Sequence, residues 1–363
     1  MNKKLQILTL LLITMLFVNA QTDSIPKSII KFEYSAFAGK TFAHHEEMKP
    51  LTHNLYMGND LRVGFQTTGK KDWHHIYKFP YFGFGFYAGS YNNPTLGNPL
   101  AGFVFLELPF SRTPKSYFST SWGVGMTFNL NEYDSVTNPE NIAIGSDMNV
   151  YIDFVFSYKY RLSDHFQIGA GIKLQHFSNG ATRYPNLGLN MASGVVTLSY
   201  SPKIIVNKFY TADKSKDYDN IEITPFFGCG FRAKSQDEPD VKYFNSTTSI
   251  SVNKRINRKR TVGIGFDYFY QGYLINYYQD QAKITDSDLM SYATFLSSGM
   301  VVDKFRLVVQ LGFYLYRPVD FGQFFYERVA LRFYPVKKLF ANVSIKAHAA
   351  KAEFIEWGVG YSF

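Results

Sequence analysis

His176, Ser178 and Asn190 are the residues whose types and spacing could do chemistry. A serine hydroxyl beside an imidazole can attack an ester carbonyl, because the imidazole takes the hydroxyl proton and later returns it to the leaving group. A third polar side chain must orient the imidazole, and the asparagine follows twelve residues after the serine. The three residues therefore predict a serine-dependent hydrolysis of acyl esters.

The strand predicted over 165–178 decides where the His-x-Ser pair points. Its even positions from Phe166 to Leu174 are apolar, whereas its odd positions are small or polar. Side chains alternate between the two faces of a strand, so His176 and Ser178 continue the apolar face. We expect the pair on the lipid-facing wall of a barrel. The alternative is a strand that ends in the headgroup zone, where polar residues are common.

A near-symmetric hairpin would bring the asparagine to this pair. If residues 179–186 form the loop, position 176 lies opposite position 190, on the apolar face of both strands. Directly opposed side chains have Cβ atoms about 4.5–5.5 Å apart. This register predicts that His176 contacts both Ser178 and Asn190. Asp147, at the end of the preceding strand, is the second candidate for the orienting residue, although its parity places it on the lumen side.

The rest of the chain has the pattern of a membrane β-barrel. It contains 35 Phe and 27 Tyr, and this aromatic content is typical of barrels with aromatic girdles. Apolar residues alternate with small or polar ones over 116–130 and again over 353–363. The predicted fold class is all-β, a transmembrane antiparallel β-barrel of the bacterial outer membrane with about 16 strands, or 14 as the alternative. The candidate strands lie near 28–39, 53–67, 80–91, 99–110, 116–130, 148–161, 165–178, 187–201, 219–233, 242–254, 259–272, 288–302, 304–316, 323–334, 338–348 and 353–363.

We expect one closed barrel over 21–363, because closure removes exposed strand edges. Two connections, 68–79 and 202–220, are longer than the other turns at the same end. The second one gives an alternative, in which the chain divides near 202–219 into two units of eight strands.

The first twenty residues have the features of a secretory signal peptide. Lys3 and Lys4 precede an apolar run, and small residues precede Gln21, so that cleavage is predicted after residue 20. The mature chain would then have one cysteine, Cys229, and no internal disulfide.

Charged and histidine-rich segments predict no second site. Neighbouring residues of an extended chain point in opposite directions, so we expect no metal site at 44–47 or 74–75. The net charge of +9 is concentrated in short turns such as 253–260. We expect these turns to be solvated, with a binding patch for anionic lipid as the alternative, and we expect no nucleic-acid partner.

The segment HFSNGATRYPNLGLN, from His176 to Asn190, resembles the active-site hairpin of the outer-membrane lipid A deacylases, the acyloxyacyl-hydrolase-like family. That family has His-x-Ser-Asn, then Pro-Asn-x-Gly and an acidic residue, whose position Asn190 holds here. Its known members are barrels of eight strands, smaller than the barrel expected here. The hairpin is also similar to that of outer-membrane phospholipase A, which has His-x-Ser-Asn-Gly and an asparagine twelve residues after the serine.

Both resemblances imply an esterase that acts on lipid A or phospholipid of the outer leaflet, in the outer membrane of a Gram-negative bacterium. The deacylase resemblance implies no cofactor, whereas the phospholipase alternative implies calcium and a homodimer. A third alternative is a non-enzymatic porin or structural barrel, because sixteen strands leave room for a channel. The implied catalytic residues are His176, Ser178 and Asn190, and the implied oxyanion or positioning residues are Asn179, Gly180 and Asn186.

Overall fold

The computed structural model describes residues 28–363, apart from 204–220, 239, 279, 281–282 and 350. The predicted signal peptide over 1–20 lies outside these residues. None of the described helices is both long enough and apolar enough to span a membrane. The described residues form strands at all sixteen predicted places. The first eight strands are β1 (Ser28–Phe42), β2 (Leu55–Thr67), β3 (Tyr81–Ser90), β4 (Gly97–Arg112), β5 (Ser116–Leu130), β6 (Asn149–Arg161), β7 (Phe166–Ser178) and β8 (Leu189–Tyr200).

The second eight strands follow the same antiparallel order, and short helices lie in the connections. The strands are β9 (Ile221–Ala233), β10 (Lys242–Arg255), β11 (Arg260–Gln271), β12 (Met290–Val302), β13 (Phe305–Tyr316), β14 (Phe325–Phe333), β15 (Leu339–His348) and β16 (Lys351–Tyr361). The helices are η1 (Glu46–Met48), α2 (Lys49–Thr52), α3 (Asp72–Ile76), η2 (Gly272–Tyr277) and η4 (Asp286–Leu289).

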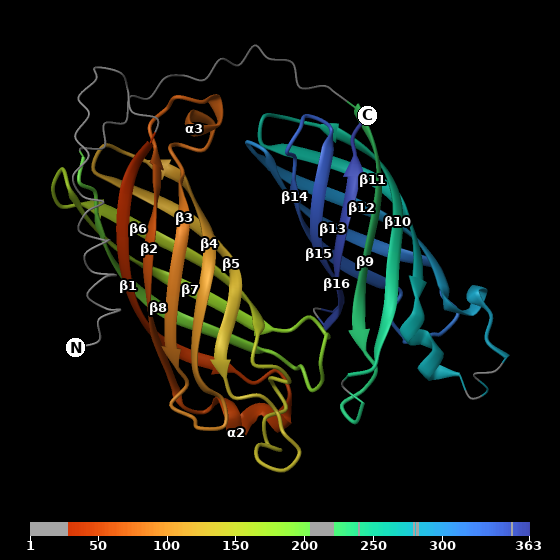
Figure 1. Ribbon diagram of the computed structural model, residues 1–363. Coiled ribbons are helices and arrows are strands. Elements are labelled where there is room, and N and C mark those ends of the chain that lie inside the picture. Colours follow the sequence, from red (N-terminus) through yellow and green to blue (C-terminus); the bar gives the residue numbers. More distant parts are fainter. Residues whose placement is uncertain (1–27, 204–220, 239, 279, 281–282, 350) are drawn as a thin grey trace, which may run out of the picture.

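The strands close into two barrels, β1–β8 and β9–β16, which Figure 1 shows side by side. The expectation of one closed barrel of about 16 strands is therefore wrong. β1 pairs with β8 instead of β16, and β16 pairs with β9. Eight strands suffice to pair both edges of a sheet, and they enclose a lumen that side chains can fill. Along the chain, the division between the two barrels falls between β8 and β9, as in the alternative division near 202–219.

Ion pairs fill the lumen of the first barrel. The Nη2 atom of Arg62 lies 2.9 Å from Asp153 Oδ2 and 3.3 Å from Asp60 Oδ2, and Lys173 contacts both carboxylates. Beside this cluster, a cavity of about 10 Å³ remains next to Arg62, which is room for about one water molecule. The premise of the porin alternative, a wide lumen, therefore does not hold for this barrel.

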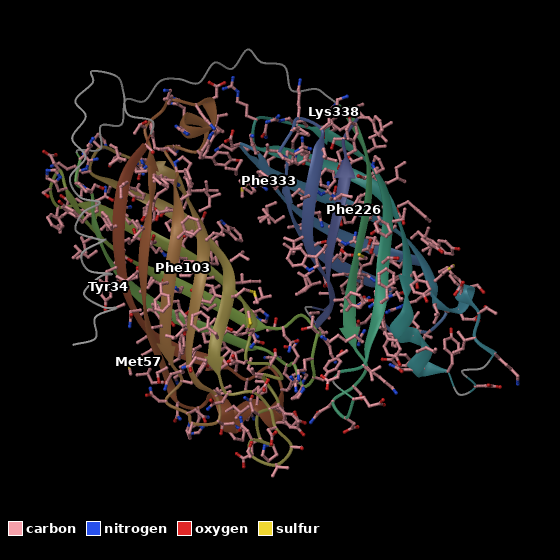
Figure 2. The ribbon with its side chains drawn as sticks, viewed as in Figure 1. Tyr34, Met57, Phe103, Phe226, Phe333 and Lys338 are labelled. Atoms are coloured by element: carbon pink, nitrogen blue, oxygen red, sulfur yellow. The ribbon has the colours of Figure 1, made fainter. Side chains whose placement is uncertain are left out.

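Apolar side chains cover the outside of both barrels. Tyr34 and Met57 on the first barrel and Phe333 on the second are exposed, whereas Phe103 and Phe226 are buried inside (Figure 2). An apolar exterior around a polar interior is the pattern of barrels that cross a lipid bilayer. The predicted all-β barrel class is thus confirmed, with two small barrels in place of one large one.

The long connection between β2 and β3 carries α3, which packs against the second barrel near the β12–β13 turn. The Tyr77 hydroxyl donates a hydrogen bond of 2.6 Å to the Val301 carbonyl, and Lys71 Nζ lies 2.9 Å from Asp303 Oδ2. Burial raises the pKa of Tyr77 to about 12, so its hydroxyl keeps the proton that it donates. The unusual length of this connection, noted in the sequence, thus serves the contact between barrels.

Candidate active site

His176 contacts both of its predicted partners. Its Nε2 atom lies 2.8 Å from the Ser178 hydroxyl oxygen, and its Nδ1 atom lies 2.7 Å from Asn190 Oδ1. An amide oxygen can only accept, so Nδ1 carries the ring proton and Nε2 is free to accept the proton of the serine. The structure thus joins a hydroxyl, a base and an orienting amide.

β7 presents the pair on the outer wall of the first barrel, as its alternation predicts. Ile172 and Leu174 on the same face are 58% and 45% exposed, whereas Lys173 and Gln175 are buried in the lumen. His176 is half-buried and Ser178 is only 6% exposed, because the loop after the strand covers them. The site therefore lies at the end of a lipid-facing strand.

The predicted hairpin register is confirmed, since His176 pairs directly with Asn190 across β7 and β8. Asp147, the second candidate for the orienting residue, does not contact the imidazole. Its side chain is exposed and accepts a hydrogen bond of 3.0 Å from the Asn129 backbone. The expectation that it faces the lumen is wrong, because β6 begins only at Asn149 and Asp147 belongs to the loop.

His44 is a member of the site that the sequence analysis did not identify. Its Nδ1 atom lies 3.4 Å from Asn190 Nδ2, and its Nε2 atom lies 3.0 Å from the Leu187 carbonyl oxygen. The amide nitrogen must donate, so His44 accepts at Nδ1 and donates from Nε2 to the carbonyl. These contacts fix which way the Asn190 amide faces. They also extend the hydrogen-bond chain beyond Ser178, His176 and Asn190 to a fourth side chain.

Asn179 fixes the start of the loop after the serine. Its backbone N–H donates to Asn186 Oδ1 at 3.0 Å, and its side-chain amide donates to the Ser146 hydroxyl and the Arg183 carbonyl. The donors of Asn179 are thus committed to the loop. The N–H of Gly180 donates to no other described residue, so it is the open donor nearest to the serine in sequence.

Gly188 packs against His176 and Ser178 from the end of the loop. A Cβ atom at this position would lie 3.1 Å from His176 Cε1 and 3.4 Å from Ser178 Cβ. The φ angle of Gly188 is +75°, which other residues adopt only with strain. A glycine is therefore needed both for the turn and for the approach to the imidazole. The Pro-Asn-Leu-Gly motif contained this residue, but its contact with the site required the structure.

The described residues contain no cluster of three or more His, Cys, Asp or Glu side chains with the geometry of a metal site. His44, from the histidine-rich segment 44–47, belongs instead to the hydrogen-bond chain described above. In the other segment, His75 Nε2 donates to the Gly69 carbonyl oxygen at 2.7 Å. His44 thus contacts a distant strand and loop, whereas His75 makes a local contact.

The Ser178 hydroxyl and the His176 imidazole thus lie in contact on the outer wall of a small barrel. Comparison of the chain with known protein families shows the family to which it belongs. Residues 58–199 match the family described as lipid A 3-O-deacylase (PagL), and residues 220–363 match the acyloxyacyl hydrolase, C-terminal domain. The chain belongs to the lipid A deacylase family, and its function is the deacylation of lipid A. The two matches fall on the two barrels.

Similar solved structures include an outer membrane channel and a transporter. An outer membrane channel from Pseudomonas putida F1 is 11% identical, with 96% of this chain and 100% of that chain covered and a TM-score of 0.20. The P. putida toluene transporter TodX is 10% identical, with 94% and 90% covered and a TM-score of 0.18. Such low TM-scores mean that the folds do not superpose, so these channels carry no argument about function. No curated protein matches the sequence.

Proposed function

We propose that the protein is a serine esterase of the Gram-negative outer membrane, which removes the acyl chain ester-linked at position 3 of lipid A. The observation that carries the proposal is the unbroken hydrogen-bond chain from Ser178 through His176 to Asn190 on the lipid-facing wall. The position of the ester follows from the description of the family that matches the first barrel, and the apolar exterior of the barrels supports the membrane.

Hydrolysis would proceed in two steps through an acyl-enzyme. Ser178 Oγ attacks the ester carbonyl while His176 Nε2 takes its proton. The C–O bond to the sugar then breaks, and His176 returns the proton to the sugar oxygen, which leaves the acyl chain on the serine. A water molecule next loses a proton to His176 and attacks the acyl-serine. The bond between the acyl carbon and Ser178 Oγ then breaks, and His176 returns the proton to Oγ. The products are a free fatty acid and the restored serine hydroxyl.

Asn190 and His44 would stabilise the imidazolium that forms in each step. The amide oxygen of Asn190 accepts a hydrogen bond from His176 Nδ1. The amide carries no formal charge, however, and its two ends can exchange places. The hydrogen bond from Asn190 Nδ2 to His44 opposes this exchange and polarises the amide, because bonds in such a chain strengthen one another. His44 would therefore act through Asn190 as a positioning residue.

The oxyanion would be held by the N–H of Gly180. Asn179 cannot supply this donor, because its backbone N–H and its side-chain amide are already bonded within the loop. The N–H of Gly180 is open, and a fixed donor aimed at a developing oxyanion contributes about 3 kcal/mol in serine hydrolases. Asn186, which holds the Asn179 backbone, would be a positioning residue.

The outward orientation would let the substrate react without leaving the bilayer. A lipid beside β7 already lies against the apolar face of Ile172 and Leu174, with its ester near the polar end of the strand. The bilayer thus provides much of the orientation that an enzyme in solution must obtain by binding.

Mass spectrometry of lipid A from cells that express each variant tests the proposal. We expect wild type and Ser298→Ala to remove one acyl chain, because Ser298 is an outward-facing serine on β12, in the other barrel. Ser178→Ala should lose deacylation, by roughly three orders of magnitude or more in rate. Unchanged deacylation by Ser178→Ala would contradict the serine mechanism. Loss of phospholipid chains alone would favour the phospholipase alternative.

The same assay addresses the cofactor. We propose that catalysis needs no metal ion, because the Gly180 N–H would supply the oxyanion donor. Chelation with EDTA should then leave the rate unchanged. A loss that calcium restores would favour the phospholipase-like mechanism and the homodimer that it implies.

A further inference from the structure

The second barrel contacts the loop between β7 and β8, residues 179–188, which directly follows Ser178. The Ala233 backbone N–H at the end of β9 donates a hydrogen bond of 3.0 Å to the Ala181 carbonyl. Beside it, Arg232 Nε donates to the Tyr184 hydroxyl at 3.1 Å. Both contacts come from the end of β9, which lies close to the loop between β7 and β8 (Figure 1). The first barrel fixes the start of the loop through Asn179, and the second barrel fixes its middle.

Ile355 of β16 packs directly against Gly180. A Cβ atom on Gly180 would lie 2.5 Å from Ile355 Cγ1, and the φ angle of Gly180 is +63°. Ile355 shares the outward face of β16 with Trp357 and Val359, which are 66% and 59% exposed, whereas Ile355 is half-buried. The loop therefore covers one residue of this otherwise open face, and it does so at the glycine next to the proposed oxyanion position.

The groups that hold the loop are themselves anchored. The guanidinium of Arg232 lies 4.1 Å from the ring centroid of Tyr273, whose hydroxyl donates to Glu353 Oε1 at 2.9 Å inside the second barrel. At the opposite end of the molecule, α3 ties the first barrel to the second through Tyr77 and Val301. Contacts at both ends thus keep the second barrel in a fixed position beside the loop.

We propose that the second barrel completes the active site by holding Gly180 in place, with Ile355 and Arg232 as positioning residues. The inference rests on the proposed serine mechanism, since it assigns the Gly180 N–H to the oxyanion. A donor that is already fixed needs no reorganisation when charge develops, so its placement affects the chemical step more than substrate binding. The C-terminal barrel then contributes to catalysis without a reactive group of its own.

Ile355→Ala and Tyr184→Phe, alone and together in the full chain, test this role. The first opens the space beside Gly180, and the second removes the acceptor of Arg232 while it keeps the ring. We expect the double variant to lower kcat about tenfold or more with little change in KM, the signature of a misplaced transition-state contact. Ile355→Val should restore most of the activity. Val359→Ala, on the same outward face of β16, is the matched control and should leave kcat unchanged.

Gel migration with and without heating shows whether each variant forms closed barrels. A double variant with closed barrels and wild-type kcat would overturn the inference, even if its unfolding temperature falls. Measuring the activity of Ser178→Ala beside that of the double variant separates the two proposals. If Ser178→Ala is inactive and the double variant is fully active, only the role of the second barrel fails; if Ser178→Ala stays active, the serine mechanism fails.

A cross-link between the loop and the second barrel gives an independent test. Ala181→Cys with Ala233→Cys, in a Cys229→Ala background, can be joined directly or by a short thiol cross-linker. We expect the joined protein to be at least as active as the open form, because the loop works in the held position. Loss of activity on joining that returns on release would show that the loop must leave the second barrel, which would overturn the inference.

Discussion

His44 orients Asn190, which in turn orients His176, so a residue that touches no reacting atom would still affect the reaction. A neutral amide has two ends of similar shape, and only hydrogen bonds decide which end faces the imidazole. His44 accepts from the amide nitrogen and donates to Leu187, and both contacts favour one orientation. The strength of a single neutral hydrogen bond sets the size of this effect.

We expect His44→Ala to lower kcat about tenfold with KM nearly unchanged, the rate equivalent of about one hydrogen bond. Because His44 is exposed, free imidazole should restore part of the activity. In an Asn190→Asp background the effect of His44→Ala should shrink, since a carboxylate has no wrong orientation. His53→Ala is the control: this exposed histidine, in the same connection, contacts only the Pro50 carbonyl among the described residues. An equal loss for both histidines would contradict this role.

The strands of the first barrel carry their charged residues inward, where the charges pair. Arg62 on β2 bridges Asp153 on β6, and it also donates to the Ser121 hydroxyl on β5. These pairs join strands that are not neighbours in the sheet, so they fix the shape of the lumen. The second barrel has the same type of centre, in which Arg328 lies 2.7 Å from Asp267. Each barrel is thus stabilised by its own buried ion pairs.

Arg62→Leu should destabilise the first barrel by about 3–5 kcal/mol, because Lys173 is then the one cation among the described residues that pairs with both buried carboxylates. The loss of stability can be measured as the urea concentration at which half of the protein no longer runs as the folded, heat-sensitive gel band. Ser121→Ala removes one neutral hydrogen bond and should cost only about 1 kcal/mol. Equal midpoints for wild type and Arg62→Leu would show that the ion pairs contribute little to the closed barrel.

At the scale of the whole molecule, two barrels of eight strands replace the one wide barrel that could have formed a channel. Eight strands enclose a lumen that side chains can fill, and those of the first barrel do so around Arg62. We expect the purified protein to give no stepwise ion conductance in planar bilayers in which a porin conducts. Regular conductance steps that appear with this protein and not with buffer would contradict this reading of the two lumens.

The sequence predicted what depends on neighbouring residues, and it failed where distant segments meet. The alternation of β7 placed His176 and Ser178 outward, and the short hairpin placed Asn190 opposite, because both follow from local geometry. Closure is not local. In one barrel of sixteen strands, β1 would lie beside β16, and His44 would be far from the site. Pairing of Phe42 with Asn190 across β1 and β8 brings His44 there instead.

Each barrel is closed by pairing between its own first and last strands. In the first, β1 pairs with β8 from Phe32 to Phe42, and in the second, β16 pairs with β9 from Trp357 to Gly360. An even number of antiparallel strands returns the chain to the end where it started, so either barrel can be added to a gene, or deleted from it, without rethreading the other.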